Sequence, residues 1–323
     1  MKIHIAWVVL LFVFAPVVCA HVPQTPGEND SLNMAHYVED PLKSWVFYDS
    51  IDTDSQARYY VFDIEKGQQL YVSAMTPDRG PFVPSIAVAA DVFDENDTLP
   101  QYVEIPNGAG VIAAYGQKGD AEYEPFTPGA YYHTAEISLD VPESGTYYAV
   151  IFSQGTGPVA LVIGRKEMFT PVEIAKVPFD TISIHLWEGQ HPLRIALPFF
   201  LVAAATLIYA WKKKESSSDI FHIASLVAGS VFSGSAAYTL YHALRSASVS
   251  GINAMIPVTL IFVLIAAVLA RSCLLWGMRG RTCSGMDRVR FAAIALLGVS
   301  SFSGFVIAPA LCTLLALFMH KAS

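Results

Sequence analysis

The sequence predicts an all-β sandwich outside the cell, jelly-roll-like in its strand spacing, followed by an α-helical bundle of four transmembrane helices. Three observations carry this prediction: a short apolar leader, apolar residues alternating with period two over residues 45–164, and four long apolar stretches after residue 192. The expected parts are a signal peptide at 1–20, an extracytoplasmic β-sandwich domain at 21–166, a juxtamembrane connector at 167–192 and a transmembrane domain at 193–323.

The leader has the features of a secretory signal. Lys2 is followed by an apolar run from Ile5 to Phe14, and the segment ends in Val18-Cys19-Ala20, with small residues at the usual cleavage offsets. The run is too short to cross a bilayer. We therefore expect cleavage after Ala20, which makes His21 the first residue of the mature chain, with an uncleaved anchor as the alternative.

Charge divides the chain into two parts that suit different solvents. Residues 21–192 contain 25 acidic and 8 basic side chains, whereas residues 193–323 contain 3 acidic and 11 basic ones. An acidic exported part repels phosphate, which argues against binding of nucleic acid or anionic lipid. Residues 21–192 also contain no cysteine. The exported domain must therefore be stabilised by its core alone, which a domain of this size can achieve.

Two β-hairpins are predicted in the exported domain. Residues 58–64 and 69–75 alternate on either side of a turn at Gly67, and residues 145–152 and 159–163 flank a second Gly/Pro turn. Further strands are expected at 85–92, 110–115 and 131–141. Because strands recur between Gly/Pro turns without a helical period, the segment indicates a β-sandwich.

Two of these stretches resemble the jelly-roll sandwiches of the pre-peptidase C-terminal type. They are Tyr-Tyr-Val-Phe-Asp-Ile-Glu-Lys-Gly-Gln-Gln-Leu-Tyr-Val at 59–72 and Glu-Ser-Gly-Thr-Tyr-Tyr-Ala-Val-Ile at 143–151. The resemblance covers about a third of the chain and implies an accessory binding or targeting module, with no catalytic residues carried over. The sequence departs from that family because the domain stands at the N-terminus without an attached protease.

The remainder of the chain predicts a connector and four membrane spans. Pro171 and Pro178 are expected to break the connector, and Trp187 stands where an aromatic belt is expected. The expected spans are about 193–211, 220–242, 252–270 and 291–319.

The basic residues between these spans predict the orientation. They concentrate in the loops 212–219 and 271–290, so both loops are expected in the cytoplasm and the N-terminal domain outside, in a multi-pass protein of the cell membrane.

An N-terminal histidine is a candidate copper ligand. The free amine and the ring of His21 would form a chelate, and His36 or His133 would supply a further nitrogen, an arrangement that resembles the histidine brace of copper monooxygenases and periplasmic copper-binding proteins. The alternative is that cleavage simply leaves a histidine first, because the exported histidines have no tight ligand spacing.

An acidic loop is a candidate calcium site. Asp91, Asp94 and Asp97 lie close together between two predicted strands, and carboxylate oxygens are the ligands that calcium prefers. The segment lacks the spacing and glycine of an EF-hand loop, so a solvated acidic loop is the alternative.

Tyrosines in the exported half suggest a glycan as another ligand. Exposed tyrosines beside acidic groups suit sugar rings, whose hydroxyls need hydrogen-bond acceptors. The aromatic residues concerned are Tyr102, Tyr115, Tyr123, Phe126, Tyr131 and Tyr132. Packing at the edge of the core is the alternative.

Sequence motifs for hydrolases and nucleotide-binding enzymes are absent. The chain contains no Gly-x-Ser-x-Gly, no His-Glu-x-x-His, no Walker loop and no paired-cysteine zinc motif. The leading hypothesis is a non-enzymatic surface module on a membrane anchor, which binds a glycan or a protein partner outside the cell. A copper-handling protein or copper oxidase, and an accessory subunit of a larger membrane complex or homo-oligomer, are the alternatives.

Overall fold

The computed structural model describes residues 21–215, 219–279 and 283–319, and its contacts divide the chain into two compact units. Among the described residues, the β domain comprises 21–124 and 130–169. The helical domain comprises 125–129 and the described residues from Thr170 to Met319. The predicted signal peptide lies outside the described residues.

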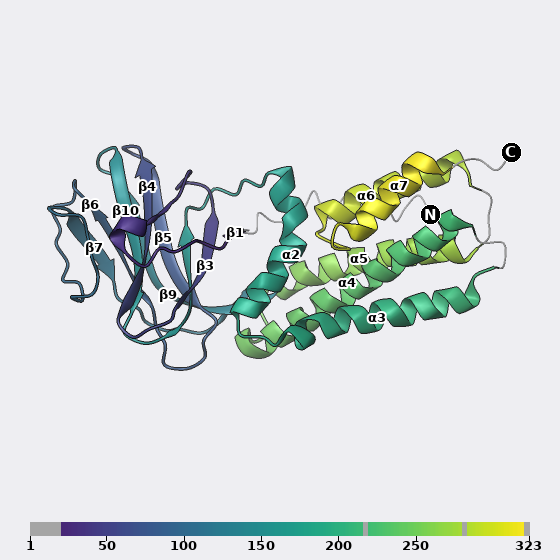
Figure 1. The fold of residues 1–323 in the computed structure, drawn as a ribbon, viewed down its shortest axis with the longest axis horizontal. Coiled ribbons are helices and arrows are strands. Elements are labelled where there is room, and N and C mark those ends of the chain that lie inside the picture. Colours follow the sequence, from purple (N-terminus) through teal and green to yellow (C-terminus); the bar gives the residue numbers. More distant parts are fainter. Residues whose placement is uncertain (1–20, 216–218, 280–282, 320–323) are drawn as a thin grey trace. The chain divides into compact units, whose positions relative to one another are not determined.

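Two β-sheets form the β domain (Figure 1). The six-stranded sheet has the order β1-β3-β11-β5-β9-β8 and the five-stranded sheet has the order β2-β4-β10-β6-β7. The first contains β1 (Val22–Gln24), β3 (Trp45–Ile51), β5 (Gln69–Thr76), β8 (Glu122–Glu124), β9 (Gly129–Asp140) and β11 (Gly157–Ile163); the second contains β2 (His36–Tyr37), β4 (Gln56–Ile64), β6 (Ser85–Ala90), β7 (Gly110–Ala114) and β10 (Gly145–Ser153). The strands predicted at 85–92, 110–115 and 131–141 are therefore present as β6, β7 and β9.

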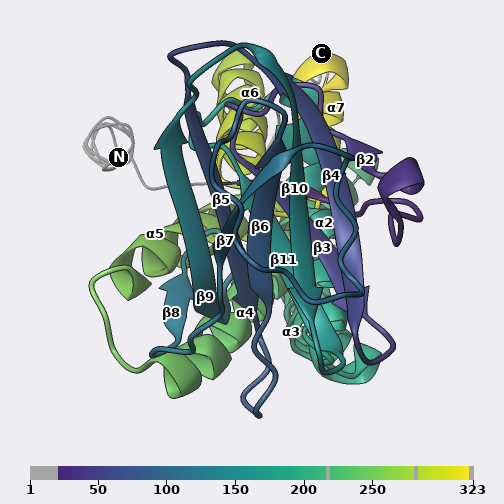
Figure 2. The same cartoon turned by 90° about the vertical axis from the view of Figure 1, so that its left-hand side faces the viewer.

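Both predicted hairpins are wrong as strand pairings. β4 pairs with β2 and β10, whereas β5 pairs with β11 and β9, so the turn at Gly67 joins strands of different sheets. The turn between β10 and β11 likewise crosses from one sheet to the other, and Figure 2 shows β10 beside β4 instead. A Gly turn between two alternating segments suits a hairpin and a crossing arch equally well, because both alternate between a buried and an exposed face.

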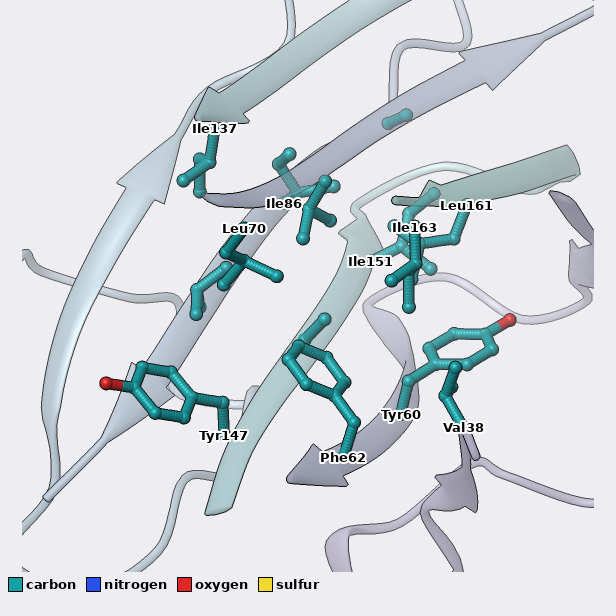
Figure 3. Packing of buried hydrophobic residues seen from close by; sticks show 14 of the residues in the cluster. Val38, Tyr60, Phe62, Leu70, Ile86, Ile137, Tyr147, Ile151, Leu161 and Ile163 are labelled. Carbon is teal, nitrogen blue, oxygen red and sulfur yellow. The ribbon is translucent and has the colours of Figure 1, made fainter. Parts of the chain in front are cut away.

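The core lies between the inner faces of the two sheets. Figure 3 shows Tyr60, Phe62 and Ile151 of one sheet with Leu70 and Leu161 of the other in one cluster. All five side chains are fully buried. Each stabilises the fold by about 1.5–3 kcal/mol relative to exposure, which explains how a domain without cysteine is held together.

Six helices form the described part of the helical domain. They are α2 (Pro171–Trp187), α3 (Pro192–Lys213), α4 (Ile220–Ser250), α5 (Ile256–Met278), α6 (Gly285–Ser300) and α7 (Ile307–Phe318). Among the described residues, α3, α4 and α5 are long and apolar enough to cross a membrane, at 22, 31 and 23 residues. Leu193, Leu197, Phe200, Leu201 and Ile208 on α3 expose their apolar side chains, as expected of a surface in contact with lipid.

The fourth apolar stretch, predicted as one span over 291–319, is a helical hairpin. Arg288 near the start of α6 donates to the carbonyls of Ala316 and Leu317 at the end of α7, at 2.8 and 3.1 Å, so the two helices run antiparallel (Figure 1). Their 16 and 12 residues reach about 24 and 18 Å, short of the roughly 30 Å of hydrocarbon. The prediction of four spanning helices is therefore not met by this segment.

The hairpin turns in the segment 301–306, where the backbone leaves the helical region. Phe302, Gly304, Phe305 and Val306 have φ between 51° and 80°. The amide of Ser303 donates to the carbonyl of Gly298 at 2.9 Å. The amide of Gly304 donates to the hydroxyl of Ser235 on α4 at 3.0 Å. These bonds satisfy backbone groups that no water would reach within hydrocarbon.

The connector contains helix α2, and its prolines do not break it. Thr170 caps the helix in a capping box with Glu173, and Pro171 occupies the first position, where the missing amide costs nothing. Pro178 lies inside the helix and removes one hydrogen bond, but its side chain is buried. Packing of the buried Pro178 side chain therefore outweighs the tendency of proline to break the connector.

A buried polar cluster joins the end of α2 to α4. The rings of His185 and His242 stack at 3.7 Å between centroids, and both side chains are fully buried. Glu188 Oε2 accepts from Gln190 Nε2 at 2.6 Å and from Arg245 Nη1 at 3.2 Å, and lies 3.2 Å from His185 Nδ1. The hydrogen-bonded cluster holds the connector against the longest membrane helix.

The tip of the α6–α7 hairpin provides a stability test. Gly304 and Gly251 have φ of 80° and 76°, but a Cβ at Gly304 would lie 2.8 Å from Ala308 Cβ and 2.8 Å from the Phe232 ring, whereas one at Gly251 meets nothing within 4 Å. We expect Gly304→Ala to cost about 1–3 kcal/mol more than Gly251→Ala, because only the first adds overpacking to the shared backbone strain. Thermal unfolding of the full chain in detergent measures the difference, and equal losses would contradict the packed tip.

Candidate functional site

A cleft opens at one end of the β-sandwich, where four connections from both sheets meet. It has a volume of about 780 Å³. Its walls come from the β3–β4 turn, the β5–β6 and β6–β7 connections, the end of β7 and the β10–β11 turn, and the lining residues that matter below are Asp54, Asp78, Phe82, Tyr102, Tyr115 and Gln154. The size is that of a small-molecule site, and such sites often lie on loops that a rigid scaffold positions.

Two of the tyrosines singled out in the sequence lie in this cleft. Tyr115 is 55% exposed, its hydroxyl donates to the Thr98 carbonyl, and its ring contacts Phe152 edge-on at 6.0 Å. The hydroxyl of Tyr102 is buried without a hydrogen-bond partner among the described residues. Burial, with repulsion from the neighbouring tyrosines, raises the pKa of Tyr102, so its hydroxyl stays protonated and can donate.

Two carboxylates, Asp54 and Asp78, also line the cleft, and their turns are held in place. Asp54 is exposed in the β3–β4 turn, where Ser55 donates through its amide to the Gln154 carbonyl at 3.2 Å. Lys118 Nζ donates to the carbonyls of Asp78 and Gly80 at 2.8 and 2.7 Å, and lies 3.8 Å from Asp78 Oδ2. The acidic side chains thus stand on loops that are cross-linked to the rest of the domain.

Glycine at 157 shapes the cleft wall. A Cβ at Gly157 would lie 2.8 Å from the ring of Phe82, and the Thr76 hydroxyl donates to the next carbonyl, that of Pro158, at 2.7 Å. The β10–β11 turn therefore closes tightly on the β5–β6 connection. The sequence offered only a generic Gly/Pro turn signal here.

His21 lies immediately before β1 in the six-stranded sheet. Its Nδ1 lies 2.5 Å from the hydroxyl of Ser44. Burial, with smaller repulsion from the charge of His133, lowers the pKa of His21 to about 4. The imidazole is therefore neutral at physiological pH, which is the form that binds metal ions.

His133 is placed in β9 at a β-bulge. The register between β5 and β9 shifts so that Met75 faces His133 while Ala74 faces Ala135, which leaves Thr134 as the extra residue. Bulges often re-aim a side chain. His133 Nε2 lies 3.9 Å from Glu122 Oε2. Repulsion from His133 contributes to the lowered pKa of His21, although the two residues are 112 positions apart in sequence.

His36, the other predicted partner of His21, lies in β2 of the five-stranded sheet. Its ring contacts Phe47 at 5.2 Å and Tyr60 at 6.1 Å, both edge-on. Burial lowers its pKa, against the attraction of Asp49. Its surroundings are aromatic, and the structure brings His133 rather than His36 within electrostatic range of His21.

The predicted calcium residues do not converge on one point. Asp97 Oδ2 accepts from the amide of Ala113 at 2.8 Å, which holds the loop against β7. Asp91 and Asp94 are exposed. Among the described residues, no three His, Cys, Asp or Glu side chains are grouped as they would be around a metal ion. The calcium site remains a prediction, as does a copper site that uses the N-terminal amine in place of a third side chain.

Comparisons with known proteins give little support for a ligand. No protein-family model matches the chain, and no curated protein matches it. Among solved structures, the chain is similar to CorA, a surface-associated copper-binding protein important in copper acquisition by Methylomicrobium album BG8. The similarity covers 44% of this chain and 100% of that one, at 13% sequence identity and a TM-score of 0.23. A likeness of this degree does not identify a function.

Titration of His21 tests its environment. We expect a pKa of about 4 in the folded chain against an ordinary value of 6.5. Because the unfolded chain then binds more protons between these values, the folded state gains stability as pH rises through this window. NMR of histidine-labelled chain, with His21→Asn to assign the signal, measures the pKa. His133→Gln should raise it, and a value at or above 6.5 in the unsubstituted chain would contradict the described burial.

Proposed function

We propose that the chain is a multi-pass membrane protein that displays its acidic β domain outside the cell as a ligand-binding module. The observation that carries the proposal is the cleft at the end of the sandwich, which is ligand-sized and is built from cross-linked loops of both sheets. The three membrane-length helices support the anchoring role. Export with cleavage after Ala20 is part of the proposal.

The ends of the helices support the proposed orientation. The amide of Glu215, after α3, donates to the carbonyl of Met278 at the end of α5 at 3.1 Å, so the basic C-terminal ends of α3 and α5 meet at one end of the bundle. Clustered basic residues favour the cytoplasmic side. The α6–α7 hairpin returns to the same end, because Arg288 contacts the last turn of α7. The C-terminal tail is then cytoplasmic, not outside as four complete spans would require.

Cysteine labelling of intact cells tests this topology. In a background without native cysteines, Ser248→Cys should react with an impermeant thiol reagent added outside. Ser284→Cys, and a cysteine appended after Ser323, should react only after permeabilisation, which also serves as the control for reactivity. Outside labelling of the appended cysteine would show that the last segment crosses the membrane. Outside labelling of Ser284→Cys would overturn the orientation itself.

Copper binding is a second candidate function, favoured by the electrostatic interaction of His133 with His21. A free amine at His21 and its Nδ1 would form a chelate, with His133 as a further nitrogen ligand, and imidazole suits Cu(II). The Ser44 hydroxyl is hydrogen-bonded to Nδ1 of His21, so this bond must break before a metal ion binds there. The neutral form of His21 removes proton competition at this ring above about pH 4.

Variants of the mature full chain in detergent test this candidate. The native start should bind about one Cu(II) with nitrogen ligands in its spectrum. His21→Ala and one extra alanine before His21 should weaken binding equally, because the second variant keeps the ring but displaces the amine. His133→Ala should also weaken binding, whereas the matched control His36→Ala should not. Retention of full affinity by the extended chain would exclude the brace.

A further inference from the structure

The cleft combines features that select one chemical class of ligand, and this inference rests on the proposed function. We propose that it binds a neutral carbohydrate. Sugars present a C–H face ringed by hydroxyl groups, so their sites need an exposed aromatic face together with hydrogen-bond acceptors. The two tyrosines and two carboxylates of the cleft supply both.

The aromatic face is provided by Tyr115. Its hydroxyl is already committed to the Thr98 carbonyl, and Phe152 supports the ring edge-on, so the ring has a fixed orientation. More than half of this side chain is exposed at the cleft. A rigid tyrosine offers a large contact area at low cost in conformational entropy, which suits it to a stacking role.

The polar groups of the cleft match the hydroxyl rim of a sugar. The carboxylates of Asp54 and Asp78 accept hydrogen bonds from hydroxyl groups. Tyr102 lines the cleft, and its buried hydroxyl has no partner among the described residues, which is destabilising. A ligand hydroxyl can pair with it once the Tyr102 side chain turns toward the cleft. Each of these groups can form a hydrogen bond with a hydroxyl group of an uncharged ligand.

Electrostatics excludes the acidic sugars. The two carboxylates lie in a domain with a large excess of acidic side chains, and Lys118 is bound to the Asp78 and Gly80 carbonyls. The described residues that line the cleft include no Lys or Arg, so a uronic or sulfated glycan would meet repulsion there. The ligand should therefore be neutral, such as a hexose or N-acetylhexosamine oligosaccharide.

The cleft is organised before binding. Lys118 holds the β5–β6 connection, Ser55 bonds the β3–β4 turn to the β10–β11 turn, and Gly157 packs directly against Phe82. A preformed site loses less entropy when it binds a weakly interacting ligand such as a sugar. The loops therefore need not fold around the ligand.

A glycan array tests the proposal with the full chain in nanodiscs. The array should hold neutral hexose and N-acetylhexosamine oligosaccharides together with uronic and sulfated ones. Calorimetry then measures the affinity of the chain for the neutral ligand that binds most strongly. Tyr115→Ala should weaken binding at least tenfold, and Tyr102→Phe several-fold, because they remove the stacking face and the buried hydroxyl. The matched control is Tyr37→Ala, since Tyr37 is also 55% exposed but lies on β2, away from the cleft. The affinity of the Tyr37→Ala variant for the ligand should differ less than twofold from that of the unsubstituted chain.

Three outcomes overturn the proposal in different ways. In a parallel screen of cationic peptides and divalent metal ions, a ligand lost in Tyr115→Ala but kept in Tyr37→Ala would leave the cleft as a binding site and reject carbohydrate as its class. Binding of acidic glycans alone would reject neutrality in the same way. If no compound of any class binds in a Tyr115-dependent manner, both the carbohydrate assignment and the cleft as the binding surface are wrong.

Discussion

The structure of the β domain depends on one connection between its two sheets. β10 lies between β4 and β6 in the middle of one sheet, and β11 lies between β3 and β5 in the middle of the other. Only residues 154–156 separate them. Because both strands are paired on both edges and buried on the inner face, this arch fixes the spacing of the sheets and therefore the core. The same turn forms one wall of the cleft, so the element that organises the fold also positions the candidate site.

The helical domain is governed by a different constraint, since hydrocarbon offers no partners to backbone groups. Helices α3 to α5 meet it by being long and continuous. The α6–α7 hairpin meets it at a break, where the amides of Ser303 and Gly304 are bonded within the turn or to α4. The buried carboxylate of Glu188 has its own partners, because it accepts hydrogen bonds from Gln190 and Arg245, whereas the ring nitrogens of His242 lack a hydrogen-bond partner among the described residues.

Local sequence patterns predicted the positions of the strands better than they predicted which strands pair. Alternation located β4, β5, β10 and β11, because a half-buried strand must alternate whatever it pairs with. Pairing is a long-range property, and a turn such as that at Gly67 does not reveal whether the chain stays in its sheet or crosses to the other. The fourth apolar stretch was predicted as one span although Ser300, Ser301, Ser303 and Gly304 interrupt it. Packing against Phe232 and Ser235 of α4 fixes the break at 301–306.

The candidate sites were predictable only in part, for the same reason. Tyr102 and Tyr115 were identified by residue type, but Asp54 and Asp78 lie far from them in sequence and join them only where the loops of one sandwich end meet. His133 was one of two proposed partners for His21, and the bulge in β9, which no sequence pattern indicated, accompanies its placement. Asp97 was assigned to calcium, whereas its carboxylate binds the amide of Ala113. Residue types indicated which chemistry each candidate site could perform, whereas the fold determines which of those side chains lie together.

We infer that the β domain is exported and then held at the membrane by the helices. The intact mass of the chain extracted from isolated membranes tests this claim most directly. We expect a single membrane-bound species that begins at His21 and still contains helices α3 to α7. A membrane-bound chain that still carries residues 1–20 would contradict export by a cleaved signal and would remove the free amine of His21. A chain found without its helices in the soluble fraction would contradict the anchoring role.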